Sequence, residues 1–202
     1  DGDTPMEEAL ELLGSLDARF LEIKADSDKY ARYQEVLKVM VTTYDEVETL
    51  EVNMRLKKNM WQGLRDFDAQ VAEWKAANFD SLNPEEMGQR VNKYGKICSQ
   101  CDKGLPSNTV LPILQDKVTT FKAMTPVVVA LRNEALKPHH WEQIEAAIHT
   151  TVDRGDNFSL GYLLELKVDL YREEIETIST AATQENVLEE MLAKVENAWR
   201  DN

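Results

Sequence analysis

Apolar residues recur along most of the chain at alternating spacings of three and four positions, which is the period of an amphipathic α-helix. The first long stripe lies between Ser15 and Gln62, where the chain contains neither glycine nor proline. A heptad-like stripe of this kind predicts a long helix that packs against a partner helix along its length. Its apolar positions are Tyr30, Tyr33, Leu37, Met40, Tyr44, Val47, Leu50 and Met54.

Capping residues predict where the N-terminal helices begin and end. Residues 4–7, Thr-Pro-Met-Glu, have the form of a capping box and predict a helix that ends near Lys24. The side-chain oxygens of residues 26–28 then offer caps for the long second helix. A further stripe extends the helical pattern to about Ala77, so at about 1.5 Å per residue the combined rod exceeds roughly 60 Å. This stripe consists of Trp61, Leu64, Phe67, Val71 and Trp74.

Turn residues divide the rest of the chain. Asn83 and Pro84 predict a cap and a first helical turn, and residues 103–108 form the clearest loop. Thr125 and Pro126 predict a bend or a restart. The expected helices cover about residues 84–101, 109–123, 127–131, 138–149, 159–166 and 169 to the end.

Strands have little support. The β-branched cluster at residues 127–129 is short and lies between helical patterns, so we interpret it as buried helix. The predicted fold class is therefore all-α. We expect an elongated array of packed helices and helical bundles, with a long coiled-coil-like helix near the N-terminus.

The last expected helix has a nearly continuous apolar face that one carboxylate interrupts. Burying Glu185 without a partner would cost several kcal/mol. It therefore lies at the rim of the face, accepts from backbone N–H groups of a neighbouring helix end, or pairs with a Lys or Arg. A directly functional carboxylate is the alternative, but acid–base chemistry needs a second positioned group and none is visible. The face comprises Tyr171, Ile175, Ile178, Ala182, Glu185, Leu188, Leu192, Val195 and Trp199.

The chain is acidic, with a formal net charge of −14 and a pI near 4.7. Nucleic-acid binding depends on clusters of Lys and Arg, and the sequence has no such cluster. The same reasoning predicts no direct binding to the acidic surface of a microtubule. No run approaches the roughly 20 apolar residues that span a bilayer. We expect a cytosolic chain, or a segment of a larger cytosolic protein, with no nucleic-acid or membrane partner.

Two cysteines, Cys98 and Cys101, are separated by two residues. Such a pair is half of a zinc site, a redox pair, or two reduced thiols near the end of a helix. The histidines His139, His140 and His149 lie in other expected elements and lack the spacing of metal ligands. The sequence therefore favours reduced thiols and predicts no metal site.

Two further groups of residues leave alternatives open. His140, at a helix start beside Trp141, is either a ligand or proton relay or a hydrogen-bonding structural residue, and the structural role is favoured. Met40, Met54 and Met60, with the tyrosines of the first stripe, form either an adaptable binding face or part of the core, and their spacing favours the core.

The chain lacks the common motifs of nucleotide and acyl chemistry. It contains no Walker-type phosphate loop, no Rossmann fingerprint and no Gly-flanked nucleophilic Ser. The sequence therefore predicts no catalytic residue and no cofactor-binding residue.

Several motifs follow one another between about Trp61 and Trp199. They are Leu131-x-Asn133-x-Ala135-Leu136-Lys137 before His140-Trp141, then Phe158-Ser159-Leu160-Gly161, then the face of the last helix. In this order they resemble the front half of the linker of dynein heavy chains. The chain departs from that pattern at Glu134, where the family often has Pro, and at His139, where it often has Arg. The expected structural anchors are Trp141, His140, Leu160, Glu185, Leu192 and Trp199.

The resemblance implies a division of the chain and a role. Residues 1–60 would form neck-like amphipathic helices, and residues 61–202 the N-terminal half of the linker, truncated at its C-terminal end. The linker would be a mechanical lever between the ATPase ring and the tail or cargo side of a microtubule-based motor. The alternative is a free-standing helical adaptor, spectrin-like or coiled coil, with no motor.

The resemblance also implies partners and a location. The partners would be the rest of the same heavy chain, namely the remaining linker, the ATPase ring and the tail, together with other dynein subunits. ATP or ADP with Mg would bind to the ATPase modules and not to this segment. Residues 163–179 look more like axonemal than cytoplasmic heavy chains, which implies the cytoskeleton of the cytoplasm and the axoneme of a cilium or flagellum.

Overall fold

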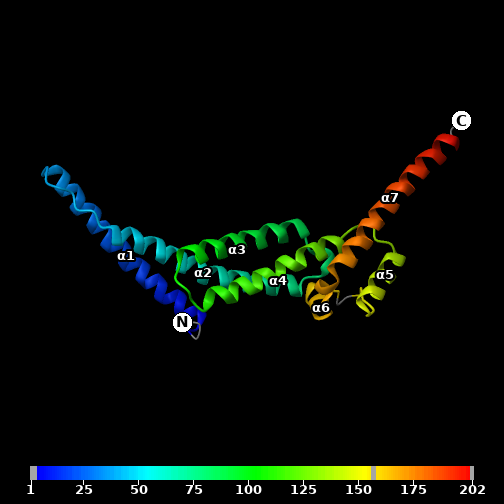
Figure 1. Cartoon of the computed structure of the whole chain (residues 1–202), viewed down its shortest axis with the longest axis horizontal. Helices are drawn as coiled ribbons and strands as arrows, with labels where there is room; N and C mark the ends of the chain where they lie inside the picture. Colours follow the sequence, from blue (N-terminus) through cyan, green and yellow to red (C-terminus); the bar gives the residue numbers. More distant parts are fainter. Residues whose placement is uncertain (1–3, 156–157, 201–202) are drawn as a thin grey trace. The chain divides into compact units, whose positions relative to one another are not determined.

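The structure is a computed structural model that describes residues 4–155 and 158–200 (Figure 1). In these ranges every regular element is helical, and one isolated antiparallel bridge joins Asn78 to Ser159. The predicted all-α fold class is therefore confirmed. The α-helices are α1 (Met6–Val36), α2 (Asp45–Ala76), α3 (Pro84–Gly104), α4 (Val110–Leu131), α5 (Pro138–Ile148), α6 (Leu160–Glu165) and α7 (Arg172–Arg200), and the 3-10 helices are η1 (Phe79–Ser81) and η2 (Val168–Tyr171).

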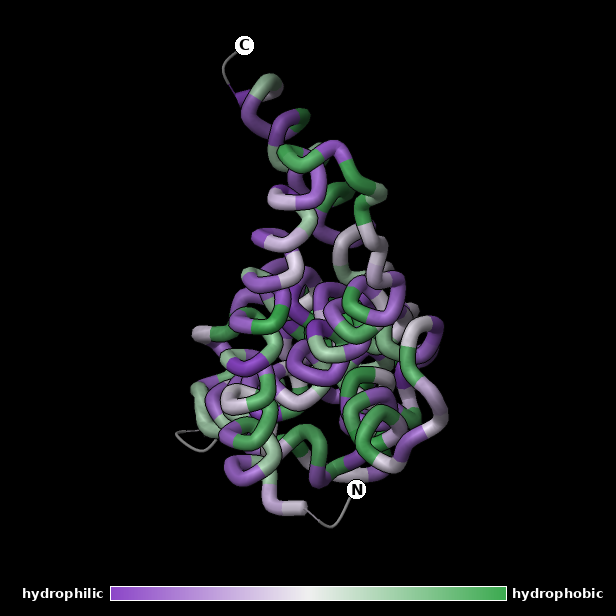
Figure 2. Tube along the Cα trace, turned by 90° about the vertical axis from the view of Figure 1, so that its left-hand side faces the viewer, coloured by the Kyte–Doolittle hydropathy of each residue, from purple (hydrophilic) through white to green (hydrophobic). Residues whose placement is uncertain are grey.

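The helices are amphipathic, as their sequence period predicts. Figure 2 shows hydrophobic and hydrophilic residues alternating along the helical turns. Within the described ranges, none of the helices has the length and apolar content that crossing a membrane requires.

The chain folds into two compact units that are interleaved in the sequence. The first unit takes residues 1–69 and 93–118, and the second takes residues 70–92 and 119–202. Helices α2, α3 and α4 each contribute to both units. The expected division into a neck and a linker at residue 60 stays a prediction.

The core of the first unit is built from α2, α3 and the start of α4. Phe67 of α2 is fully buried, and its ring centre lies 4.9 Å from that of Tyr94 on α3. Aromatic pairs at this separation add to the stability that burial provides. The other buried residues of this unit are Ala9, Phe20, Leu56, Met60, Leu64, Cys98, Cys101, Val110, Leu111, Leu114 and Val118.

The first two helices differ from the sequence prediction. α1 continues through residues 26–28 without a break, and the chain leaves the helical conformation between Val36 and Asp45. The predicted helix end near Lys24 and the predicted long helix across residues 37–44 are therefore wrong. α1, the turn at 37–44 and the part of α2 up to residue 60 form what we call the helical hairpin.

Local hydrogen bonds and one unusual backbone angle account for the turn. Lys38 adopts a φ of 55°, in the left-handed region that ends many helices. The side chain of Gln34 accepts from the N–H of Thr42 at 2.9 Å and donates to its hydroxyl at 3.1 Å. The apolar stripe alone does not reveal this turn, because a helix and a helical hairpin share the same period.

Folding back brings α1 and α2 side by side. Lys24 pairs with Glu51 at 2.5 Å, and Lys58 pairs with Asp17 at 2.7 Å. These pairs are partly exposed, so each contributes little to stability. Phe20 of α1 is buried in the hairpin and supplies apolar contact.

Two of the predicted caps have different outcomes. Asn83 caps α3 as predicted, because its Oδ1 accepts from the N–H groups of Glu85 at 3.0 Å and Glu86 at 3.2 Å. The predicted capping box of α1 is wrong, because Pro5 occupies the N-cap and no side chain caps this end.

Of the bend or restart predicted at Pro126, the restart is wrong, because α4 runs through this residue, and the bend stays a prediction. Proline lacks the N–H that would continue the helical ladder. The hydroxyl of Thr125 donates to the carbonyl of Phe121 at 2.8 Å, which adds a bond beside the interrupted ladder. Val127 and Val128 are fully buried in the helix, as predicted for this cluster, and their packing outweighs the cost of the proline. The prediction of burial is wrong for Val129, which is 52% exposed because it lies on another face of the helix.

Candidate functional site

The chain reverses direction between α4 and α5 through residues 132–137, which we call the reversal turn. Its backbone is closed by a bond from the N–H of Leu136 to the carbonyl of Asn133 at 3.1 Å. The side chain of Asn133 also accepts from the N–H of Ala135 at 3.0 Å. Lys137 is extended and Pro138 begins α5, so the missing N–H of proline costs nothing there.

Trp141 is held between aromatic and cationic neighbours. It is 8% exposed, and its ring lies edge-on to Phe158 with 6.1 Å between the ring centres. The ring centre of Phe158 in turn lies 4.8 Å from that of Phe79. The guanidinium of Arg154 lies 4.7 Å from the centre of the Trp141 ring, within the range of a cation–π contact.

Each residue of the Phe158-Ser159-Leu160-Gly161 motif has a packing role. The carbonyl of Phe158 accepts from the N–H of Phe79 at 2.9 Å, and Leu160 is fully buried. The hydroxyl of Ser159 caps α6 by accepting from the N–H of Tyr162 at 3.2 Å. At Gly161, a Cβ would lie 3.0 Å from the backbone oxygen of Lys75. The motif therefore fastens α6 against the end of α2.

Replacing Gly161 by alanine is expected to lower the free energy of unfolding by about 1–2 kcal/mol, because the added methyl meets a backbone oxygen that cannot rotate away. Chemical denaturation measures this change. Gly14→Ala is the matched control, because nothing lies within 4 Å of its Cβ position, and it should raise stability by about 0.5–1 kcal/mol through helix propensity. Equal gains from both substitutions would contradict the close approach of α6 to α2.

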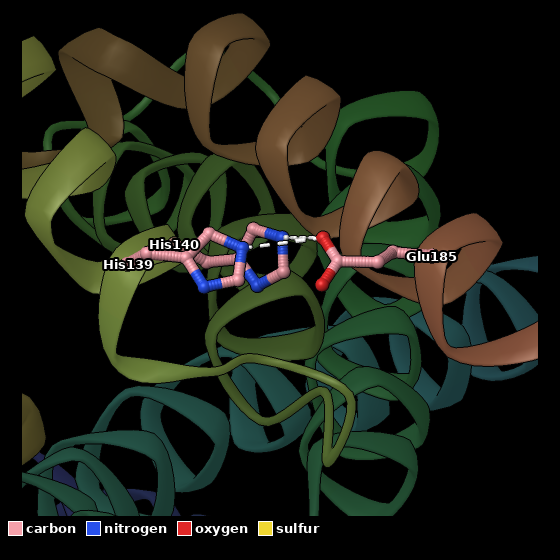
Figure 3. Close-up of side chains that lie close together, drawn as sticks. All are labelled: His139, His140 and Glu185. Carbon is pink, nitrogen blue, oxygen red and sulfur yellow. Dashed lines mark hydrogen bonds and ion pairs between the residues drawn. The ribbon is translucent and has the colours of Figure 1, made fainter. Parts of the chain in front are cut away.

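Side chains at the start of α5 converge on a carboxylate of α7 (Figure 3). His139 Nε2 and His140 Nε2 each lie 3.2 Å from Glu185 Oε2. Lys137 Nζ lies 3.0 Å from Glu185 Oε1 and also donates to Glu189. We call these five residues the polar cluster. Of the solutions that the sequence left open for Glu185, the structure contains the pairing with a lysine, at the partly exposed rim of the apolar face.

The two ring nitrogens of His140 have different roles. Its Nδ1 accepts from the backbone N–H of Lys137 at 3.1 Å, so a neutral ring carries its proton on Nε2. That N–H then donates to Glu185, and the His140 side chain is only 3% exposed. Both nitrogens are satisfied in a buried position, which fits the hydrogen-bonding structural role.

A metal centre is the other chemistry to test against these residues. The ligand atoms of His139, His140 and Glu185 lie within 4.8 Å of one another, and these residue types bind zinc. A metal on His140 Nε2 would need the proton on Nδ1, which would break the bond from the Lys137 backbone. The Lys137 ammonium also competes for the carboxylate. The residues therefore fit a hydrogen-bonded link between α5 and α7 better than a metal site.

The polar cluster stabilises the ionised form of its carboxylate. The hydrogen bond from Lys137, followed by that from His139, lowers the pKa of Glu185 below its ordinary value of 4.5. The hydrogen bond to Glu189, followed by that to Glu185, raises the pKa of Lys137 above its ordinary value of 10.5. Both shifts favour the charged pair at neutral pH.

Glu185→Gln is expected to cause a small loss of stability at neutral pH that disappears in acid. Because the pKa of Glu185 is lower in the folded state, its contribution is fully present above the unfolded value near 4.5 and is lost as the pH falls through the folded value. Denaturation midpoints measured across the acid range check this. Glu196→Gln, at an exposed carboxylate on the same helix and away from its first turn, is the control. A difference for Glu185→Gln that stays constant through acid pH would count against the pairing.

A second polar link joins the reversal turn to α7. Asn133 Nδ2 lies 2.9 Å from both the carbonyl and the hydroxyl of Ser179, and 2.8 Å from the hydroxyl of Thr183. The hydroxyl of Ser179 donates onward to the carbonyl of Ala130 at 2.9 Å. The sequence analysis did not single out this role. The only signal was the position of Asn133 within the motif before α5.

The anchors expected on α7 are not all buried. The apolar face is fully buried at Ile175 and Ala182, but Leu192 is 63% exposed and Trp199 is 82% exposed. Leu188 and Val195 of the same face are exposed as well. Trp141, His140, Leu160 and Glu185 all lie in the second unit, where His140 contacts Glu185. The anchor role of Leu192 and Trp199 stays a prediction.

The two cysteines lie on α3 in the first unit, and both are buried. Burial, with a smaller contribution from Cys101, raises the pKa of Cys98 to about 11. Burial also raises the pKa of Cys101, whose Sγ lies 3.5 Å from the carbonyl of Leu56. Thiols held in the protonated form are poor nucleophiles and poor metal ligands. These observations agree with the favoured interpretation of reduced thiols.

Comparison with known proteins identifies a family match over most of the chain. Residues 47–202 match the family model described as dynein heavy chain, N-terminal region 2. Dynein axonemal heavy chain 6 of Homo sapiens is 35% identical over 190 residues, which cover 94% of this chain and 5% of that protein. The Chlamydomonas reinhardtii dynein-1-beta heavy chain of the flagellar inner arm I1 complex is 25% identical over 205 residues, covering 98% of this chain and 4% of that protein. The chain thus spans about 5% or less of the length of these curated relatives.

Proposed function

The chain belongs to the dynein heavy chain family, in its axonemal type, and on this basis we propose that residues 61–202 form the N-terminal half of the linker, with residues 1–60 as the neck before it. The proposed role is a mechanical lever that couples an ATPase ring to the tail side of a microtubule-based motor. The axonemal relatives support a place in the axoneme of a cilium or flagellum, and there the lever would serve ciliary or flagellar movement.

The observation that best supports a load-bearing role is the double attachment of α7. A helix transmits force to its neighbours only if its contacts with them persist under load. Asn133 holds the first half of α7, at Ser179 and Thr183, and the polar cluster holds its middle at Glu185. Beside these links, the fully buried Ala182 supplies apolar contact. Load on α7 therefore passes to the reversal turn and α5.

Nucleotide binding and microtubule binding would both lie outside this segment. ATP or ADP with Mg would bind to the ATPase modules of the whole motor, and microtubule binding would lie elsewhere in the heavy chain. The proposed partners are the rest of the same heavy chain and other dynein subunits. The free-standing adaptor is the weaker alternative, because residues 47–202 match the dynein heavy chain model and the relatives reported above are heavy chains.

Microtubule gliding with the full-length motor tests the lever. A heavy chain with Asn133→Ala and Glu185→Gln together should retain its ATPase rate but lose about half or more of its gliding velocity. The reason is that part of the work done by the ring would pull α7 away from the reversal turn and α5 instead of moving the tail. Asn186→Ala is the control, since within the described residues this amide donates to Glu190 on its own helix and does not join α7 to another element. Unchanged gliding in the double variant, with α7 shown to be loosened by hydrogen exchange, would refute the proposal.

A further inference from the structure

The turn at residues 37–44 is exposed along its whole length. Its Met40 is 91% exposed. Core packing, which the sequence favoured for the methionines, is therefore wrong for Met40, although it holds for the buried Met60. Residues 40–44 belong to no helix or strand, so an enzyme can reach this part of the backbone without opening a regular element.

Two adjacent threonines of this turn have different surroundings. The hydroxyl of Thr42 accepts from the side-chain amide of Gln34 at 3.1 Å, and the backbone N–H of Thr42 donates to the same side chain at 2.9 Å. The hydroxyl of Thr43 is exposed and makes no hydrogen bond within the described part of the chain. Thr43 therefore offers a hydroxyl that the fold itself does not use.

The charges along the chain differ on the two sides of Thr43. Exposed carboxylates stand two, three and five positions after it, and no Lys or Arg lies among them. These acidic residues are Asp45, Glu46 and Glu48. The nearest basic residues before Thr43 are Lys29, Arg32 and Lys38. Protein kinases select their substrates partly by such charge patterns. Acidic residues after a hydroxyl suit a kinase whose peptide cleft carries basic residues opposite those positions.

The acidic positions lie in the first turn of α2, and a kinase that binds an extended peptide has to unwind this turn. The first N–H groups of a helix have no acceptors within the helix, so unwinding its end breaks few hydrogen bonds. The side chains of Asp45 and Glu46 are exposed, so little burial is lost as well. The segment can therefore become extended at low cost.

Other described hydroxyls with an acidic residue three positions further on are less suitable acceptors. Ser99 lies inside α3 and donates to the carbonyl of Gly95 at 3.1 Å. Thr150 has one carboxylate at that distance, and the basic Arg154 follows it directly. Thr4 is partly buried beside the start of α1. Thr43 combines an exposed hydroxyl, an irregular backbone and several acidic residues after it.

We propose that Thr43 is a phosphorylation site for a serine/threonine protein kinase that recognises acidic residues after the acceptor. The hydroxyl oxygen of Thr43 attacks the γ-phosphorus of ATP, the bond from that phosphorus to the β–γ bridging oxygen breaks, and ADP leaves. The hydroxyl proton passes to an aspartate of the kinase. The proposal goes beyond the lever function and does not depend on it, because it uses only residues of the first unit.

The phosphate changes the surface of the turn. It carries a charge of about −1.5 to −2 at neutral pH and three strong acceptor oxygens. The same turn exposes the apolar side chains of Leu37 and Met40, which are 70% and 91% exposed. An anionic group among them makes their burial against an apolar surface unfavourable. Phosphorylation thus converts an apolar turn into an anionic one.

Phosphorylation of the intact heavy chain by a purified kinase tests the site. The probe is casein kinase II with ATP, because this kinase requires acidic residues after the acceptor, and mass spectrometry locates the phosphate. We expect phosphate on Thr43 at a rate at least about tenfold above that on Thr42, whose hydroxyl is held by Gln34. Thr43→Val should abolish this product, and Thr42→Val should leave it. No phosphate on Thr43, or equal rates at the two threonines, would overturn the proposal.

The same peptide isolated from the cells that make the protein should carry phosphate on Thr43. Its absence there, under phosphatase inhibition and with the unmodified peptide detected, would also overturn the proposal. A phosphate found on Thr42 or Tyr44 in place of Thr43 would have the same consequence.

Charge variants test how the kinase recognises the segment. Glu46→Gln should slow phosphorylation of Thr43 about tenfold or more, because it removes the carboxylate three positions after the acceptor. Glu35→Gln, at an exposed carboxylate before the acceptor, is the matched control and should leave the rate within about twofold. Both variants should keep the denaturation midpoint of the unaltered chain, because both side chains are exposed. Equal rates in the two variants would refute recognition through the acidic residues after Thr43.

Discussion

Replacing Trp141 by alanine is expected to lower the free energy of unfolding by about 3–5 kcal/mol. The substitution removes a large side chain that is 8% exposed and leaves a cavity beside Phe158. It also removes the ring beneath the Arg154 guanidinium. Chemical denaturation followed by circular dichroism measures the loss.

The same substitution at Trp199 is the matched control. Trp199 is 82% exposed near the end of α7, so Trp199→Ala should change the free energy of unfolding of this chain by less than about 0.5 kcal/mol. Similar effects at both positions would show that Trp141 is not an anchor.

Replacing Asn133 by alanine is expected to cost about 2–3 kcal/mol, although the side chain is small and partly exposed. The amide serves both ends of one link, because it donates to Ser179 and Thr183 of α7 and accepts from Ala135 in the reversal turn. Each of these bonds contributes about 0.5–1.5 kcal/mol, and the loss leaves the hydroxyls of Ser179 and Thr183 without the donor that Asn133 provides. Chemical denaturation measures the total.

Hydrogen exchange separates this role from a general loss of stability. Asn133→Ala should speed amide exchange in α7 near residue 179 more than in α3, because the link to α7 is what the substitution removes. Asn186→Ala removes an amide whose bond in the described part of the chain lies within α7, and it should cost no more than about 0.5 kcal/mol. Equal losses in the two variants would rule out the special role of Asn133.

The N-terminal helices show where periodicity stops being informative. The apolar spacing from Tyr30 to Met54 identified helix correctly on both sides of residues 37–44, but not within them, where the chain turns. The turn depends on the φ of Lys38 and on bonds between Gln34 and Thr42, eight residues apart. None of these three residues is a common turn former, so the local composition did not predict a turn. Met40 is exposed because it lies in this turn, so the sequence did not predict its exposure either.

The candidate site was predictable in part. The sequence indicated that Glu185 needs a partner, because a carboxylate in an apolar face costs free energy when unpaired. It did not show that the partner would be Lys137, which is 48 positions away and comes close only when α5 packs on α7. The roles of Asn133 and Ser179 also depend on contacts between distant segments. Such contacts have no local signal.

Local interactions let the sequence establish the helical class, the cap at Asn83, the start of α5 at Pro138 and the family to which the chain belongs. These features depend on backbone period, on short-range hydrogen bonds and on ordered motifs, all of which can be followed along the chain. Tertiary packing alone decided where α1 ends, which residues hold α7, and which part of its apolar face is buried. Burial depends on what lies opposite a residue in space, and the period of a helix states only which residues share a face.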